Sequence, residues 1–321
     1  MSRIFTGWKD QSTQLFGQHT IVEGHSLATS PLFSDEWLAK LIEAAPEGTY
    51  HVNTMDPETH DPRTRREGTI DGLSGAEVIE AIAKGTIWIL LQNPGETNPA
   101  YRDLLCEIYD EMHANVPGLA TYKQKMSLLI SSPKVQVYYH CDVPGQTLWQ
   151  LRGRKRVYVY PNRPPFLPQP ALERIVLGEA HEISLAYEPW FDDYAQVIEL
   201  EPGHMAHWPL NCPHRIVNHD CLNVSFTTEH WTDALRDQYA INYANGIIRK
   251  GLAARLGERS NGWGLSQSSR GVAKWGKMGV AAAAKFSGLQ RRNAAAFHID
   301  FKVDPDAPHS VRDIDGYELA K

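Results

Sequence analysis

The sequence of 321 residues contains no apolar run that approaches the roughly 18 residues a membrane-spanning helix needs. Its first residues also lack the charged and then apolar pattern that is typical of an export signal. We therefore expect a cytoplasmic protein that does not cross a membrane. The net charge of −6 argues against nucleic acid as the main partner, because chains with that function usually carry a basic excess.

Cysteine is scarce, and its spacing excludes the common zinc modules. The four cysteines, Cys106, Cys141, Cys212 and Cys221, form no CxxC pair. We expect reduced thiols, with Cys141 and Cys212 acting as small buried apolar residues.

The sequence shows no internal repeat, and its pattern divides the chain into three parts. Residues 1–120 read as a mixed α/β part, in which Ser34, Ser74 and Asn98 are predicted to cap helices. Residues 121–231 carry short strands broken by Pro, Gly and Asn, which are typical of a β-sandwich or barrel. The predicted strands lie at 126–130, 134–139, 147–151, 157–160, 197–200, 205–208, 215–217 and 222–227.

The third part, residues 232–321, is predicted to be helical at 232–256 and 272–288, with a final strand at 297–303. The first of these helices is amphipathic, so it can cap the β-sheet part or pair with a second copy of the chain. We slightly favour a homodimer formed through these C-terminal helices.

Two histidines and one carboxylate offer the ligand set of a non-heme Fe(II) site. His140 and Asp142 lie two residues apart at the end of an apolar strand, so their side chains project the same way. His214, from a distant strand, would complete a facial triad and leave the opposite side of an octahedral ion open. His207 is the main rival for the third position because it lies on the same segment.

An ordered set of segments resembles the JmjC family of cupin-fold oxygenases, in particular its hydroxylase branch typified by factor inhibiting HIF. The segments are His140-Cys141-Asp142, the run from Gln150 to Pro161, the run from Glu199 to Pro209, and His214. The resemblance covers about residues 125–231. It implies a double-stranded β-helix (jelly roll) of mainly β structure with flanking helices, and it assigns His140, Asp142 and His214 as iron ligands.

The resemblance also implies how a cosubstrate would be held. Lys155 matches the lysine that anchors the distal carboxylate of 2-oxoglutarate, and a compact ammonium suits that contact. Gln146 stands where the hydroxylase branch has an asparagine near the iron-bound carboxylate. Val137 replaces a threonine, so Tyr138 or Gln150 would have to supply its lost contact. Ser225 lies about where an asparagine is common, with Asn223 as a neighbouring candidate.

The implied activity uses Fe(II), 2-oxoglutarate and O2 to hydroxylate an unactivated C–H bond, with release of succinate and CO2. The substrate would be a protein, a peptide or an amino-acid-like small molecule, and the candidate substrate contacts are Trp149, Gln150 and Trp208. Core packing is the alternative for such aromatic residues. Three other functions stay open: demethylation of an N-methyl group, a metal-binding cupin that uses no 2-oxoglutarate, and a regulatory module that binds a small ligand.

Overall fold

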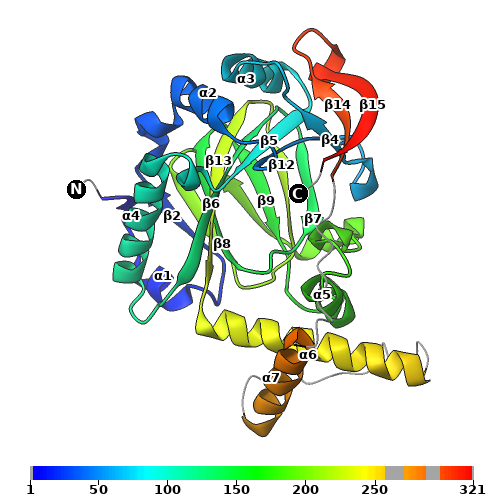
Figure 1. Ribbon diagram of the computed structural model, residues 1–321. Coiled ribbons are helices and arrows are strands. Elements are labelled where there is room, and N and C mark those ends of the chain that lie inside the picture. Colours follow the sequence, from blue (N-terminus) through cyan, green and yellow to red (C-terminus); the bar gives the residue numbers. More distant parts are fainter. Residues whose placement is uncertain (1–2, 257–270, 287–296, 320–321) are drawn as a thin grey trace.

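The computed structural model describes residues 3–256, 271–286 and 297–319 (Figure 1). Its centre consists of eight strands: β6 (Tyr122–Ser131), β7 (Gln136–His140), β8 (Gly145–Arg152), β9 (Lys155–Val159), β10 (Gln196–Leu200), β11 (His204–His207), β12 (His214–Asn218) and β13 (Asn223–Trp231). One sheet has the order β11-β8-β13-β6 and the facing sheet has the order β10-β9-β12-β7. All these neighbours are antiparallel. This strand order is that of a double-stranded β-helix, so the predicted fold class is confirmed.

The larger sheet continues on both sides of the jelly roll. Beyond β11 lie β2 (Ile21–His25) and β1 (Phe5–Thr6). Beyond β6 lie β5 (Ile87–Gln92), β3 (Tyr50–Thr54), β4 (Arg66–Thr69), β14 (Phe297–Val303) and β15 (Val311–Leu319). The sequence predicted β14 but not β3, β4 or β15, because these three strands are polar and lack a clean apolar alternation.

The helices lie on one face of this sheet and at one end of the jelly roll (Figure 1). The seven α-helices in the described ranges are α1 (Asp10–Leu15), α2 (Asp35–Ala44), α3 (Gly75–Lys84), α4 (Pro99–Asn115), α5 (Gln169–Val176), α6 (Asp233–Leu256) and α7 (Gly271–Phe286). The three predicted caps are confirmed. Ser34 Oγ accepts from the Trp37 N–H, Ser74 and Glu77 form a capping box, and Asn98 Oδ1 accepts from the Ala100 N–H.

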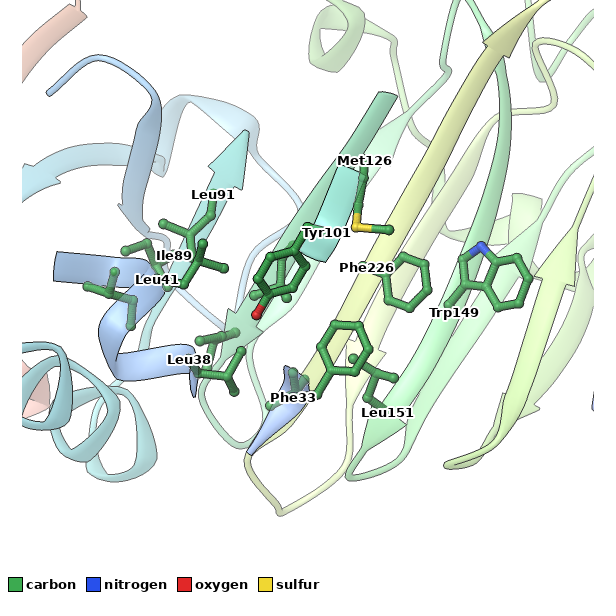
Figure 2. Packing of buried hydrophobic residues seen from close by; sticks show 14 of the residues in the cluster. Phe33, Leu38, Leu41, Ile89, Leu91, Tyr101, Met126, Trp149, Leu151 and Phe226 are labelled. Carbon is green, nitrogen blue, oxygen red and sulfur yellow. The ribbon is translucent and has the colours of Figure 1, made fainter. Parts of the chain in front are cut away.

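Because successive side chains point to opposite faces of a strand, the side chains of the jelly roll are divided between two cores. The outer face of the larger sheet packs against α2, α3 and α4, and Trp149, Phe226 and Tyr101 belong to this core (Figure 2). The inner faces of the two sheets meet in a second apolar cluster that includes Leu148, Val157 and Ile216. Side chains that point inward from either sheet therefore share one enclosed interior.

A strand from the last part of the chain pairs with a strand from the first part. β14 pairs in parallel with β4 and antiparallel with β15, while α6 lies against α5 and α7. The three-part division at residues 120 and 231 stays a prediction, and the sheet draws strands from all three parts. Positions 287–288 of the second predicted C-terminal helix lie outside the described residues. None of the helices in the described ranges is long and apolar enough to span a bilayer.

The junction between β4 and β14 offers a test of this packing. A Cβ atom on Gly68 would lie 2.4 Å from the ring of the fully buried Phe301, so the glycine is required by close approach. We expect Gly68→Ala to lower the free energy of unfolding by about 1–3 kcal/mol, because overpacking forces side chains and backbone to move. Urea denaturation would measure the change.

Gly251→Ala is the matched control, since nothing lies within 4 Å of a Cβ at this helical position. Alanine there should be neutral or stabilising by up to about 1 kcal/mol. Equal effects of the two substitutions would contradict the proposed close packing at Gly68.

Candidate metal centre

The structure brings together the three predicted metal ligands, His140, Asp142 and His214. The antiparallel pairing of β7 and β12 sets His140 directly opposite His214, and Asp142 follows two residues after β7 ends. One ligand atom from each residue lies within 4.8 Å of the others, and His214 Nε2 is 3.3 Å from Asp142 Oδ2. In the described ranges, no other group of three His, Cys, Asp or Glu side chains meets this criterion.

Hydrogen bonds fix both imidazoles in the form that a metal ligand needs. Nδ1 of His140 lies 2.8 Å from the Tyr138 carbonyl, and Nδ1 of His214 lies 3.1 Å from the Cys212 carbonyl. Because a carbonyl only accepts, each Nδ1 donates its hydrogen and each Nε2 keeps its lone pair. Both Nε2 atoms therefore present a lone pair beside the Asp142 carboxylate.

Burial of the Asp142 carboxylate has a free-energy cost that a bound cation would offset. Asp142 is 9% exposed, and its Oδ2 atom has no hydrogen-bond partner among the described residues. Burial raises the pKa of Asp142 and lowers the pKa of His214 well below its usual range. Two imidazoles and one carboxylate oxygen without a hydrogen-bond partner fit a divalent transition metal.

His207 is ruled out as the third ligand by its position. It lies on β11 with its ring stacked on Phe16 at 4.0 Å, on the outer side of the larger sheet. Cys141 and Cys212 are buried free thiols, as predicted from their spacing. The metal centre therefore takes its third ligand from β12.

Lys155 lies in the same interior with its charge unmatched. Its side chain is 0% exposed, and its ammonium donates to Ser225 Oγ at 2.9 Å. Among the residues described, no carboxylate forms an ion pair with it, and burial lowers the pKa of Lys155 to about 7. An ammonium with donors to spare and no counterion is suited to bind an anion.

The other predicted cosubstrate residues lie in three different places. Ser225 contacts Lys155, and because its oxygen accepts from the ammonium, its own hydroxyl hydrogen remains to be donated. Asn223 instead accepts from Gln150 Nε2 at 2.8 Å and donates to the Cys221 carbonyl. Its amide therefore holds the turn after β8.

Tyr138 lies in a third place, against Met55 and Trp88, where burial raises its pKa to about 12. The charges that act on its hydroxyl are those of Arg65 and Glu67. That Tyr138 replaces the missing threonine contact stays a prediction.

The predicted substrate contacts need a further correction. Trp149 is fully buried on the outer face of the larger sheet, so it packs the core and does not line a cleft. Gln150 is also fully buried, and its amide nitrogen donates to the carbonyls of Arg152 and Gly153. Trp208 packs on the His214 ring at 4.6 Å and is almost fully buried, so it supports a ligand.

A cleft next to the residues that follow Asp142 is built from elements that sequence patterns did not connect. It has a volume of about 1050 Å³ and lies between the start of β6, the residues Val143 and Pro144 that follow Asp142, and the helices α5 to α7. Trp231, Tyr239 and Glu182 contribute to its lining. Glu182 lies in a short 3-10 turn (Glu182–Ser184), far from the ligands in sequence, so no spacing signal identified it.

Two carboxylates share the surroundings of Asp142. Burial raises the pKa of Glu182 to about 8 and also raises the pKa of Glu229, and the charge of Asp142 contributes to both shifts. Lys125 acts in the opposite direction on Glu229. The approach to the metal centre is therefore polar and rich in carboxylates.

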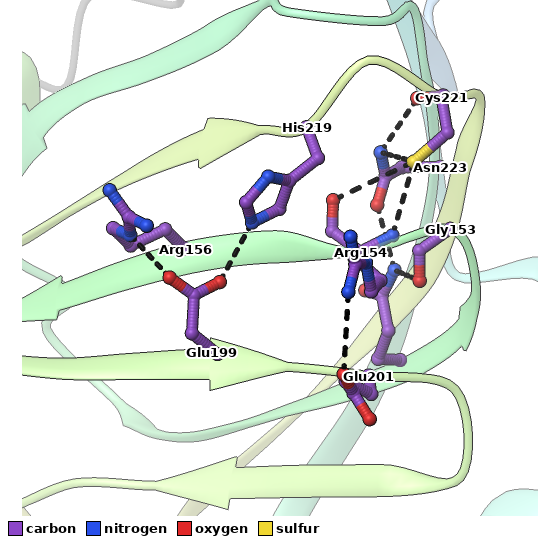
Figure 3. Close-up of polar contacts among 9 residues, drawn as sticks. Gly153, Arg154, Arg156, Glu199, Glu201, His219, Cys221 and Asn223 are labelled. Carbon is purple, nitrogen blue, oxygen red and sulfur yellow. Dashed lines mark hydrogen bonds and ion pairs between the residues drawn. The ribbon is translucent and has the colours of Figure 1, made fainter.

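The arginines beside Lys155 pair with carboxylates on the exposed face of the smaller sheet. Figure 3 shows Arg156 paired with Glu199, which also contacts His219, and Arg154 directed at Glu201. These pairs lie on the exposed face of the smaller sheet. They form a solvated charged surface and leave only Lys155 facing inward.

Comparison with known proteins gives no transferable function. No protein-family model matches this sequence, and no curated protein matches it either. A structure of Escherichia coli YcfD is 13% identical with a TM-score of 0.49, and the match covers 90% of this chain and 69% of that one.

A structure described as the E. coli ribosomal oxygenase YcfD in complex with cobalt and 2-oxoglutarate is also 13% identical, with a TM-score of 0.48. That match covers 90% of this chain and 68% of the other. A DMSP lyase structure covers 35% of this chain and 40% of its own, at 14% identity and a TM-score of 0.23. All three scores lie below 0.5, so the fold rests on the strand order of this chain.

Burial of the charged Lys155 side chain lowers the free energy of unfolding, and a substitution can measure this effect. Since burial favours the neutral amine, Lys155→Met should stabilise the ligand-free protein by about 1–4 kcal/mol. Unfolded lysine titrates near 10.5 and folded Lys155 near 7. Between these values the unfolded state binds more protons, so wild-type stability rises with pH.

The gain from Lys155→Met should therefore be largest below pH 7 and shrink toward pH 10.5. Urea denaturation at several pH values would measure it, with Lys134→Met as a control at an exposed lysine. A destabilised Lys155→Met protein would show that the ammonium contributes to folding.

Proposed function

We propose that this chain is an Fe(II)- and 2-oxoglutarate-dependent oxygenase that hydroxylates a C–H bond of a protein, peptide or amino-acid-like substrate. The observation that carries the proposal is the pairing of two features in one interior. A triad of two imidazoles and a carboxylate lies on the same inner surface as a fully buried lysine, and no carboxylate of the described residues pairs with that lysine.

The two features match the two ends of 2-oxoglutarate. In the overall reaction, 2-oxoglutarate, O2 and R–H give succinate, CO2 and R–OH. His140, Asp142 and His214 would hold the metal, which supplies a site where the 2-oxo acid and dioxygen react. Lys155 would pair with the distal carboxylate, and the Ser225 hydroxyl would donate a second hydrogen bond to it.

The remaining residues of the interior exclude water and fix the cosubstrate between these ends. Both sheets contribute buried apolar side chains to this space, namely Leu148 from the larger sheet and Val157 and Ile216 from the smaller one. An apolar enclosure strengthens the contact between Lys155 and a carboxylate and protects a reactive centre from solvent. Substrate would approach through the cleft beside Val143 and Pro144.

The test is the visible spectrum of anaerobic protein reconstituted with Fe(II), before and after addition of 2-oxoglutarate. Wild type should gain a charge-transfer band. His214→Ala should lose the iron, whereas Lys155→Ala should keep it and bind 2-oxoglutarate about 100-fold more weakly, because a buried charge pair is broken.

Lys134→Ala serves as the control, since Lys134 is exposed and pairs with Asp220. A band that Lys155→Ala leaves unchanged would contradict the assigned anchor. The absence of a band despite stoichiometric iron would favour a cupin that uses no 2-oxoglutarate. Formaldehyde release from a methylated peptide would identify a demethylase.

A pH dependence follows from the same lysine. Only protonated Lys155 can pair with the distal carboxylate, and its pKa in the ligand-free protein is about 7. We expect the dissociation constant of 2-oxoglutarate to increase up to tenfold per pH unit above pH 7. Titrations between pH 6 and 9 would measure this slope, and a flat profile would show that the bound anion does not depend on Lys155.

A further inference from the structure

Gln150 lies directly beside the residue that receives the Lys155 ammonium. It is opposite Ser225 in the pairing of β8 with β13, so the two side chains are neighbours on the inner face of the larger sheet. Lys155 donates to Ser225 Oγ from β9 of the smaller sheet, and all three residues are 0% exposed. Gln146, the other predicted cosubstrate amide, lies four residues earlier on the same face of β8. Gln150 therefore lies at the end of the interior where the distal carboxylate is proposed to bind.

The amide nitrogen of Gln150 holds the turn that leads into Lys155. It donates to the carbonyl oxygens of Arg152 and Gly153 at 2.6 and 3.1 Å, and to Asn223 Oδ1 at 2.8 Å. Only two residues join β8 to β9, and Lys155 is the first residue of β9. A movement of this turn would therefore move Lys155 as well.

The turn after β8 is packed against the turn that precedes β13 (Figure 3). Gly153 has a φ of +72°, and a Cβ atom there would lie 2.3 Å from the Leu222 carbonyl oxygen. The Arg154 N–H donates to Cys221 Sγ at 3.3 Å, and Asn223 Nδ2 donates to the Cys221 carbonyl at 2.9 Å. Asn223 is thus fixed by its own turn, and its Oδ1 atom gives the buried glutamine a fixed acceptor.

The N–H groups of the Gln150 amide are committed to protein acceptors. The amide has two N–H groups, and three oxygens of the chain accept from them. The remaining Oε1 atom only accepts, as does a carboxylate, so it is not suited to bind one. An effect of Gln150 on an anion in this interior would therefore have to pass through Lys155.

We propose that Gln150 is a positioning residue for Lys155, which ties the turn before β9 to Asn223 so that the ammonium stays directed at Ser225 and at the distal carboxylate. This inference rests on the proposed function, because it gives Gln150 a part in holding 2-oxoglutarate without a contact to it. Lysine has a flexible side chain, so an ammonium that is not held in place loses conformational freedom on binding, and affinity falls.

The experiment is a double-mutant cycle between Gln150 and Lys155, read out as 2-oxoglutarate affinity. The charge-transfer band of the anaerobic Fe(II) protein would be titrated with 2-oxoglutarate for wild type, Gln150→Met, Lys155→Ala and the double variant. Methionine has a similar length and lacks the N–H groups. We expect Gln150→Met to weaken 2-oxoglutarate binding about tenfold, because a binding group depends on the hydrogen bonds that hold it in place.

In the Lys155→Ala background, the same substitution should change the affinity by less than about twofold, because its effect passes through the ammonium. Equal losses in both backgrounds would overturn the proposal, since Gln150 would then act independently of Lys155. An unchanged affinity of the Gln150→Met single variant would overturn it too.

Asn223→Ala decides the question if Gln150→Met does not fold, which thermal unfolding would show. This variant removes an acceptor of the Gln150 amide, so we expect a loss of affinity that again depends on Lys155. Additive losses in this second cycle would overturn the proposal. The affinity for Fe(II) should stay within about twofold of wild type in each variant, because none of them changes one of the three ligands.

Gln124→Met is the matched control. It removes an amide on β6 that donates to Thr121 at 2.7 Å, and it should bind Fe(II) and 2-oxoglutarate as wild type does. The absence of a band in wild type despite stoichiometric iron would overturn the proposed function and this inference together. A normal wild-type band with additive losses would overturn the inference alone.

Discussion

The register between β7 and β12 is the constraint on which the candidate site depends. His140 and His214 face each other across this antiparallel pair, and the register shifts between His214 and Ile216. Because side chains alternate between the faces of a strand, a slip of one residue would turn one histidine toward the outer surface. The apolar residues that point inward on both sheets, such as Leu148 and Ile216, hold this register by their burial.

The interior that this register creates contains two charged groups, Asp142 and Lys155, that are buried. Within the part of the chain that the structure describes, Oδ2 of Asp142 accepts no hydrogen bond and the Lys155 ammonium pairs with no carboxylate. Burying either group without a partner opposes folding. A metal at one end and a dicarboxylate between the two would satisfy both, so the features that cost stability are the ones that would bind ligands.

The rest of the chain supports and surrounds this interior. The extended sheet and the helices α2, α3 and α4 bury the outer face of the larger sheet, where Trp149 and Phe226 lie (Figure 2). The outer face of the smaller sheet stays in solvent and carries charge pairs such as Arg156 with Glu199 (Figure 3). The helices α5 to α7 leave a cleft beside Asp142, so access comes from one end of the jelly roll.

The sequence by itself determined the features that depend on local spacing. These are the helix caps at Ser34 and Ser74, the eight short strands, and the shared direction of His140 and Asp142, because periodicity and capping act within a few residues. Resemblance to a family added His214 and Lys155. Only the tertiary structure decided that Trp149 faces the outer core and that Glu182 and Glu229 lie near enough to Asp142 for its charge to raise their pKa values. Each of these outcomes depends on which strand or turn lies beside the residue, and such neighbours are brought together from distant parts of the chain by burial of the two cores.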